Sequence, residues 1–170
     1  MKKVLFLVLS VSLAAFLLSA CGDTTQVQDT TPDTPTVKAD TGGDDMAVRA
    51  INNQVRGFAI DGFPGAKATL SKSEDLENMK RIVGLVKPIV EKVPDGYVMQ
   101  ITGHAADYPT PAIQRSVSNA RAKMVYDELR KAGVPASKMT YKGVGISEPR
   151  DGYDNKDFAQ RRVSFKAVKK

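Results

Sequence analysis

Apolar residues alternate with polar ones in several short stretches of the chain, and this period of two is typical of a half-buried β-strand. Strands are expected within four stretches: residues 47–60, 97–102, 139–144 and 162–168. In the last of them, Val163, Phe165 and Ala167 alternate with polar neighbours. The first stretch ends at a turn-rich segment containing two glycines and a proline, which predicts a break before the next element.

Between these strands the apolar period lengthens to three or four residues, which predicts two amphipathic helices. Ser71 and Glu74 have the spacing of a capping box, so the first helix is expected to begin there. Pro88 lies inside this helix. Its apolar stripe consists of Leu76, Met79, Val83, Val86, Val90 and Val93. The second helix is expected over residues 112–131, with its apolar face made by Ile113, Val117, Ala120 and Met124.

The order of these elements is β-α-β-α-β-loop-β, without a convincing internal repeat. This order predicts an α+β domain in which two main helices pack on one face of a four-stranded mixed sheet, a two-layer sandwich. A chain of 170 residues with 42% hydrophobic content has room for one such domain and its appendages.

The N-terminal segment has the layout of an export signal. Two lysines precede an apolar run, and small residues then lead directly to Cys21, the only cysteine of the chain. The sequence Leu18-Ser19-Ala20-Cys21 resembles a bacterial lipobox, which implies cleavage before the cysteine and its modification by fatty acids such as palmitate. An ordinary signal peptide with a stray thiol, or a transmembrane anchor, is the alternative. Because Gly22 replaces the aspartate that retains enterobacterial lipoproteins at the inner membrane, the resemblance favours the outer membrane.

The region after Cys21 is poor in large apolar side chains and rich in Thr, Asp, Pro and Gly, so it is expected to remain a disordered tether. The predicted organisation is therefore a signal peptide at 1–20, a lipidated N-terminus with an acidic linker at 21–45, and a folded domain at 46–170.

The linker and the domain differ in charge. Residues 22–45 carry six Asp and one Lys, a net charge of −5, whereas 22 Lys and Arg against 13 acidic residues give the domain +9. A basic domain suits an anionic polymer or lipid, although a merely solvated surface is equally consistent with the charge. Among anionic polymers, nucleic acid is the least suitable partner, because the protein is expected to be exported.

Three short motifs follow one another in residues 98–168. They are Gly103-His104 after a strand, Ser118-x-x-Arg121-Ala122 on the next helix, and Gln160-Arg161-Arg162-Val163 before the last strand. In this order and spacing the motifs resemble the OmpA-like domain, the module of peptidoglycan-associated lipoproteins, OmpA C-termini and flagellar stator proteins. The resemblance implies noncovalent binding of the peptidoglycan stem peptide at its diamino acid, with the domain in the periplasm.

A free diamino acid terminus presents an ammonium and a carboxylate on one carbon, and each charge needs a partner when it is buried. The resemblance implies that Arg121, with Arg161 or Arg162, binds the carboxylate. The family's aspartate position is occupied by Ala106, so Asp107 is the candidate partner of the ammonium. Asp107 as a turn residue that binds backbone donors is an equally weighted alternative.

Two further candidate positions also depart from the family pattern or have a competing interpretation. Gln114 and Gln160 replace family asparagines, and the first is a candidate ligand residue. His104 could bind a ligand, but a lone histidine at a strand end is more often structural. The departures at Ala106 and at the two glutamines leave a second function class open: a scaffold that does not bind the wall and instead contacts envelope proteins or anionic lipid.

Other function classes find little support in the residue types present. One histidine and one cysteine provide no metal-ligand set, and no activated nucleophile or acid–base pair is recognisable. The sequence therefore predicts a binding protein without enzymatic activity, cofactor or metal.

Overall fold

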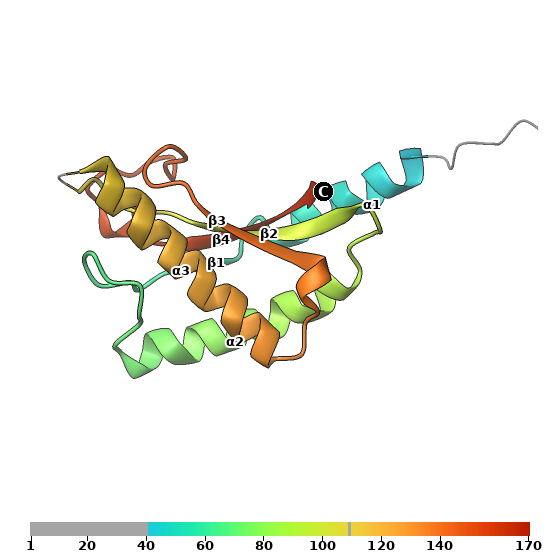
Figure 1. The fold of residues 1–170 in the computed structure, drawn as a ribbon, viewed down its shortest axis with the longest axis horizontal. Coiled ribbons are helices and arrows are strands. Elements are labelled where there is room, and N and C mark those ends of the chain that lie inside the picture. The colour runs from blue at the N-terminus through green and yellow to red at the C-terminus, as the bar shows by residue number, and fades with distance from the viewer. Residues whose placement is uncertain (1–40, 109) are drawn as a thin grey trace, which may run out of the picture. The chain divides into compact units, whose positions relative to one another are not determined.

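The computed structural model describes residues 41–108 and 110–170, and Figure 1 shows their arrangement. The seven main elements, in chain order, are α1 (Thr41–Val55), β1 (Ala59–Ile60), α2 (Ser73–Glu91), β2 (Tyr97–Gly103), α3 (Pro111–Lys131), β3 (Met139–Gly143) and β4 (Val163–Lys169). Two short 3₁₀ turns, Ala136–Lys138 and Phe158–Gln160, precede β3 and β4. The predicted signal peptide, the predicted lipidation site Cys21 and most of the predicted linker lie outside the described residues.

The four strands form one mixed sheet in the order β1-β4-β2-β3. β2 runs parallel to β3 and antiparallel to β4, and β1 pairs antiparallel with β4 through only two residues. The parallel pair requires a crossover, which α3 provides. The predicted α+β class and the mixed four-stranded sheet are confirmed, with three helices instead of two.

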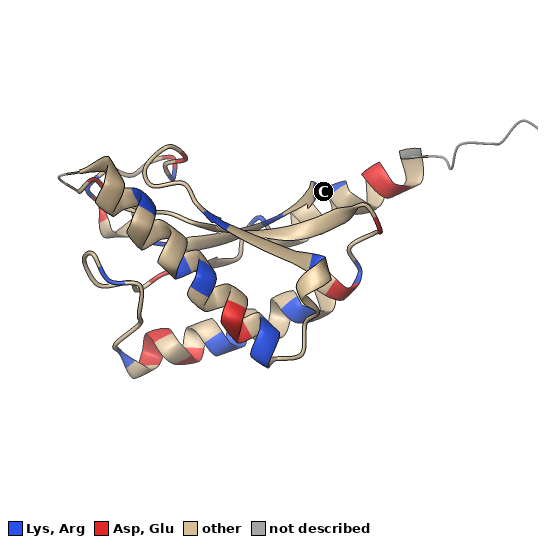
Figure 2. Cartoon of the chain, viewed as in Figure 1, with Lys and Arg blue, Asp and Glu red and all other residues tan. Residues whose placement is uncertain are grey.

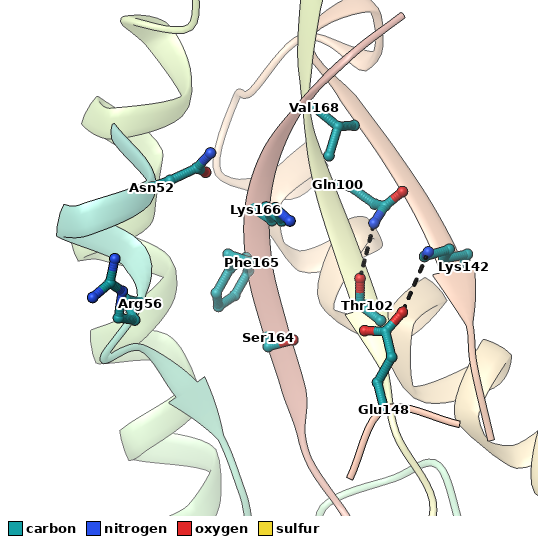
Figure 3. A pocket seen from close by; sticks show the side chains of 10 residues that line it. All are labelled: Asn52, Arg56, Gln100, Thr102, Lys142, Glu148, Ser164, Phe165, Lys166 and Val168. Carbon is teal, nitrogen blue, oxygen red and sulfur yellow. Dashed lines mark hydrogen bonds and ion pairs between the residues drawn. The ribbon is translucent and has the colours of Figure 1, made fainter. Parts of the chain in front are cut away.

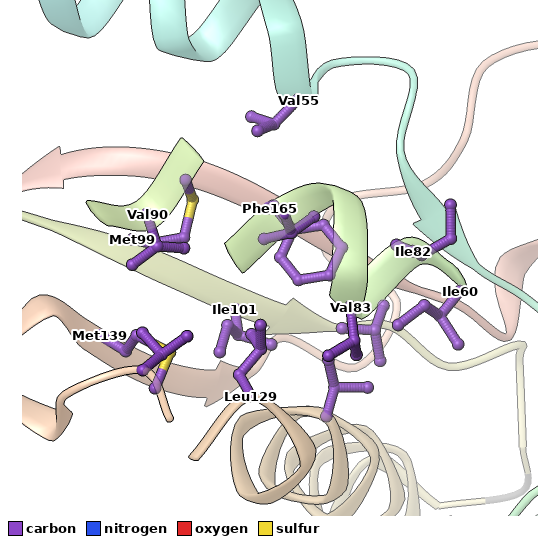
Figure 4. Packing of buried hydrophobic residues seen from close by; sticks show 14 of the residues in the cluster. Val55, Ile60, Ile82, Val83, Val90, Met99, Ile101, Leu129, Met139 and Phe165 are labelled. Carbon is purple, nitrogen blue, oxygen red and sulfur yellow. The ribbon is translucent and has the colours of Figure 1, made fainter. Parts of the chain in front are cut away.

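The hydrophobic core lies between the sheet and the helices, as Figure 4 shows. Met99 and Ile101 of β2 are fully buried there, and Leu129 of α3 and Val86 and Val90 of α2 pack against the same cluster. Because fully burying such a side chain contributes about 1.5–3 kcal/mol, this face of the sheet supplies most of the driving force for folding.

The stretch 47–60, in which the first strand is expected, is helical over most of its length. Residues 47–55 belong to α1, and the strand is reduced to Ala59–Ile60. Val48, Ile51 and Val55 are the buried residues of this helix, at intervals of three and four positions. α1 also begins at Thr41, inside the segment predicted to be linker.

α1 lies beside β4 at the point where β1 ends. The side chain of Asn52 donates to the carbonyl of Ala167 at 3.1 Å and accepts from the amide of the same residue at 2.7 Å. The amide side chain thus binds β4 as a neighbouring strand residue would, and it satisfies backbone groups that β1 is too short to reach.

Two details of the predicted helices are also corrected. α2 begins at Ser73, and its N-cap Lys72 makes no side-chain capping bond, so the Ser71–Glu74 capping box does not form. In α3, Ile113 and Ala120 are exposed. The buried face of α3 consists of Gln114, Ser118, Arg121, Ala122, Val125 and Leu129. The first half of the buried face is therefore polar.

The Lys and Arg residues of the domain are spread over the helices, strands and loops, as the colours in Figure 2 show. The net charge of +9 between residues 46 and 170 therefore does not by itself mark one binding face. Local geometry has to identify the sites.

Candidate functional site

Three loops and the first turns of α3 gather at one end of the sheet (Figure 1). The loop after β2 is fixed to the long connection between β3 and β4 by two backbone bonds. The amide of Ala105 donates to the carbonyl of Gly145 at 2.9 Å, and the amide of Asp107 donates to that of Asn155 at 2.8 Å. The segment predicted to carry the ligand residues is therefore held by residues 40 to 50 positions further along the chain.

Two glycines let α3 approach the sheet at this end. A Cβ at Gly103 would lie 1.9 Å from the carbonyl oxygen of Ser118, and a Cβ at Gly143 would lie 2.2 Å from the amide of Asn119. The hydroxyl of Ser118 accepts from the amide of Gly145 at 3.0 Å and so joins the helix to the turn after β3. The family motif residues Gly103 and Ser118 are thus packing partners.

Arg121 is fully buried beneath this end of the sheet. Its guanidinium donates to three backbone carbonyls: Gly65 at 2.6 Å, His104 at 2.9 Å and Lys67 at 3.0 Å. It also lies over the ring of Phe63, 5.2 Å from the ring centroid. Burial lowers the pKa of this guanidinium, but arginine stays protonated in proteins. Arg121 makes no ion pair with any described residue.

Tyr108 covers Arg121 from the loop after β2. The phenol accepts from the guanidinium at 3.3 Å and donates to the carbonyl of Gly65, so that one hydroxyl joins two loops over the arginine. Gln114 holds the same loop from below, donating to the carbonyl of Tyr108 at 2.9 Å. Arg121 therefore lies behind Tyr108 and the carbonyl of Gly65.

Asp107 is the exposed acid of the site, whereas Ala106, at the family's aspartate position, is buried. The carboxylate of Asp107 accepts from the side chain of Gln114 at 3.1 Å. Asp107 and Arg121 share no hydrogen bond or ion pair within the described residues. They are connected through Gln114 and Tyr108, because Gln114 binds both Asp107 and Tyr108.

The remaining predicted site residues organise the loop before β4. Arg162 is buried and donates to the side chain of Gln160 and to the carbonyl of Glu148, both at 3.1 Å. Gln160 also accepts from the amide of Arg150 at 2.8 Å. Arg161 is half-buried and donates to the carbonyl of Phe63 at 2.9 Å. Arg161 is therefore closer to solvent than Arg121 or Arg162.

Both ring nitrogens of His104 bond within the protein. The residue is only 2% exposed, with Nδ1 3.1 Å from the carbonyl of Glu148 and Nε2 2.8 Å from the hydroxyl of Ser164. Burial, followed by the nearby charge of Arg162, lowers the pKa of His104 to about 3. The imidazole is thus neutral at physiological pH, and it joins the site to the opposite face of the sheet.

The carbonyl partners of Arg121 could not be identified from the sequence. Gly65 and Lys67 bind it through their main chains, 56 and 54 positions away, and no side-chain pattern marks such a role.

Within the described ranges, no cluster of His, Cys, Asp or Glu could hold a metal ion. Nor does any helix there combine the length and apolarity needed to cross a membrane.

Comparison with solved structures places this fold among OmpA-like domains. The OmpA-like domain of FopA1 from Francisella tularensis has 22% identity and a TM-score of 0.51, covering 64% of this chain and 68% of that one. The C-terminal domain of Helicobacter pylori MotB has 17% identity and a TM-score of 0.52, covering 66% and 85%. The peptidoglycan-associated lipoprotein from Burkholderia pseudomallei also has 17% identity and a TM-score of 0.52, covering 72% and 99%.

Sequence comparison gives the same assignment. No curated protein matches the chain. The profile of the OmpA family, however, matches residues 62–162, which run from the turn before α2 to the start of β4. This match spans more than half of the sequence and contains all three motifs except the final Val163, so the chain belongs to the OmpA family.

Proposed function

We propose that this protein binds peptidoglycan noncovalently through the diamino acid of the stem peptide and tethers the envelope to the cell wall. Membership of the OmpA family supports this function, as does the fold shared with a protein named as a peptidoglycan-associated lipoprotein. The observation that carries the proposal is Arg121, a buried cation that has no carboxylate partner among the described residues.

A ligand carboxylate would be a better partner for Arg121 than a neutral carbonyl, because hydrogen bonds between two charged groups are shorter and stronger. In this proposal the carboxylate displaces Tyr108 and the carbonyl of Gly65, the contacts that cover the guanidinium. Asp107 is exposed and binds the ammonium, while Gln114 positions Asp107. Arg161 lies near solvent and assists at the carboxylate; Arg162, His104 and Gln160 hold the surrounding loops.

Sedimentation of the protein with insoluble purified peptidoglycan tests the proposal. Asp107→Asn removes the charge but keeps the shape, and since a charged hydrogen bond is worth about 1.5–3 kcal/mol, binding should weaken roughly ten- to a hundredfold. Asp95→Asn is the matched control, because Asp95 is exposed in the turn before β2, at the opposite end of that strand from the site. Equal binding of both variants and wild type would refute the role of Asp107.

Arg121 needs a folding control in the same assay. Its full burial and its three carbonyl partners mean that Arg121→Ala should destabilise the domain by about 3 kcal/mol or more. Arg121→Lys keeps the charge but lacks the planar fork that binds a carboxylate bidentately, so loss of sedimentation by folded Arg121→Lys supports carboxylate binding at this position. Undiminished binding by that folded variant contradicts it.

The anchor is the second part of the proposal: Cys21 carries the lipid, and the protein is held in the outer membrane with its domain in the periplasm. Cys21→Ser should release the mature protein into the soluble periplasmic fraction, because lipid chains supply the anchoring energy at about 0.8 kcal/mol per buried methylene. Membrane fractionation checks this expectation. A Cys21→Ser protein that still requires detergent would refute lipid anchoring.

The buried state of Ala106 and Arg121 also favours one alternative, a scaffold that keeps the fold without binding the wall. Such a protein would contact envelope proteins or anionic lipid through its basic surface. Wild-type protein that fails to sediment with peptidoglycan, but sediments with vesicles containing anionic lipid, would select this alternative.

A further inference from the structure

The face of the sheet that α2 and α3 leave open carries a groove of about 620 Å³, shown in Figure 3. α1 forms one wall, and the strands form the floor. We call this the sheet groove, and its lining consists of Asn52, Arg56, Gln100, Thr102, Lys142, Glu148, Ser164, Phe165, Lys166 and Val168. Its volume lies in the range of small-molecule sites, about 300–1,000 Å³. Asn52 and Arg56 precede the matched family region, and Lys166 follows it.

The strand register arranges the polar groups of the sheet groove in rows. Thr102 of β2 lies opposite Ser164 of β4 on one side and opposite Lys142 of β3 on the other. One row therefore contains a lysine and two hydroxyls. Gln100 lies opposite Lys166 in the next row, so the second lysine is on the other side of the groove. Directly opposed residues on neighbouring strands have Cβ atoms about 4.5–5.5 Å apart, close enough to contact one small ligand together.

The buried histidine determines which way the two hydroxyls can bond. Because His104 is neutral and the carbonyl of Glu148 can only accept, Nδ1 carries the proton and Nε2 must accept from Ser164. The hydroxyl of Ser164 therefore donates its only hydrogen to His104, so towards the groove it can only accept hydrogen bonds. Thr102 accepts from Gln100 at 3.3 Å and keeps its own hydrogen to donate. A ligand hydroxyl can donate to Ser164 and accept from Thr102.

The cations of the sheet groove lack strong partners. Lys166 is exposed, and within the described part of the chain its ammonium makes no ion pair. Arg56 donates to the neutral side chain of Asn53 at 2.7 Å. Lys142 is 3.6 Å from Glu148, but both side chains are about half exposed, so this pair contributes little. An incoming anion could bind these cations without breaking a buried contact.

We propose that the sheet groove binds an acidic sugar, a ligand whose carboxylate or phosphate pairs with Lys142 or Lys166 while its hydroxyls bind Ser164 and Thr102. The cations alone would accept any anion, and the hydroxyl row is what selects a polyol. This site lies on the opposite face of the sheet from Arg121, and it does not depend on the stem-peptide site proposed above.

The test uses the full mature chain made soluble by Cys21→Ser, with glucose 6-phosphate, glucose and inorganic phosphate as probes in an NMR titration. Glucose 6-phosphate should shift the amides of residues 100–102 and 164–166. It should bind at least about tenfold more tightly than either other probe, because only it combines the charge with hydroxyls. Inorganic phosphate binding as tightly as glucose 6-phosphate, or shifts confined to other segments, would overturn the proposal.

Variants locate the site. Lys166→Gln should weaken binding of glucose 6-phosphate about tenfold, and Ser164→Ala should weaken it several-fold. The matched control is Lys80→Gln, at an exposed position of α2, which should leave binding unchanged. Lys166 is exposed, so its variant should remain folded. Equal weakening by Lys166→Gln and Lys80→Gln, or tighter binding of a tetra-aspartate peptide than of the sugar phosphate, would show general charge attraction and refute sugar recognition.

Discussion

The two faces of the sheet bury the same strands in different ways. On the face covered by α2 and α3, Met99 and Ile101 are fully buried, and α3 lies so close that its backbone contacts the glycines at the strand ends. On the other face, Gln100 and Thr102 lie between lysines in an open groove. The alternation of side chains along one strand thus builds a rigid support on one side and a polar surface on the other.

The difference extends to the cations. Arg121 on the covered face is fully buried and held by three carbonyls, whereas the ammonium of Lys166 on the open face is exposed and makes no ion pair with a described residue. A ligand can reach Arg121 only after a rearrangement, whereas Lys166 is accessible as it stands. His104 contacts both regions, since its carbonyl accepts from Arg121 and its ring binds Ser164.

The largest expected effect comes from filling the close contact on the covered face. Gly103→Ala would place a Cβ 1.9 Å from the carbonyl oxygen of Ser118, so α3 or β2 must move. We expect the free energy of unfolding to fall by about 3 kcal/mol or more, because overpacking at a backbone contact cannot be relieved by rotating a side chain. Denaturant unfolding followed by circular dichroism measures the change.

Gly57→Ala provides the comparison for this variant, since a Cβ at Gly57 meets nothing within 4 Å. Its stability should stay within about 0.5 kcal/mol of wild type. If Gly103→Ala is as stable as Gly57→Ala, the close approach of α3 to the sheet is not as described.

A second, smaller effect should come from the residue that joins the two faces. The pKa of His104 is about 3 in the folded protein and 6.5 as the ordinary value, so between these values the unfolded state binds one proton more. Stability from this group is complete above pH 6.5 and is lost as the pH falls. The slope is about 1.4 kcal/mol per pH unit, which gives roughly 2 kcal/mol between pH 6.5 and pH 5.

The matched variant for this prediction is His104→Asn, which can still donate to the carbonyl of Glu148 but does not titrate. His104 is the only histidine of the chain, so the difference between the two pH profiles isolates its contribution. Parallel profiles for wild type and His104→Asn between pH 5 and pH 6.5 would contradict a neutral buried imidazole.

The sequence predicted β2, β3, β4 and the helices α2 and α3 to within about two residues, because their apolar periods reflect burial on one face. The strand expected within residues 47–60 is present as β1, but α1 was not predicted, although Val48, Ile51 and Val55 have helical spacing. The turn after Ile60 marked the end of the strand, whereas α1 is stabilised by packing against β4, which is more than 100 positions away in the sequence.

The buried face of α3 could not be read from apolar spacing for a physical reason. Its first half packs through Gln114, Ser118 and Arg121, whose polar groups are satisfied by loops distant in sequence. An apolar stripe therefore pointed to a neighbouring face of the helix. The family motifs pointed to Arg121 and Ser118, but they gave no indication that backbone carbonyls bind the arginine.

The smallest effect on stability, and the sharpest test of the contrast between covered and open sites, is expected from Tyr108→Phe. The phenol joins Arg121 to the carbonyl of Gly65, and losing these bonds should lower the free energy of unfolding by only about 1 kcal/mol, because Tyr108 is half-buried. If Tyr108 must move before a ligand carboxylate reaches Arg121, moving the side chain costs less free energy in the variant than in the wild type. Peptidoglycan binding should then become tighter, by up to about fivefold, because roughly 1 kcal/mol of closure is removed. Binding of glucose 6-phosphate in the sheet groove should not change.

Tyr126→Phe is the control for this prediction, since Tyr126 lies in the second half of α3, where its ring packs against Tyr141. Weaker sedimentation of Tyr108→Phe, with the control unchanged, would instead show that the phenol binds the wall directly and that Arg121 remains covered in the complex.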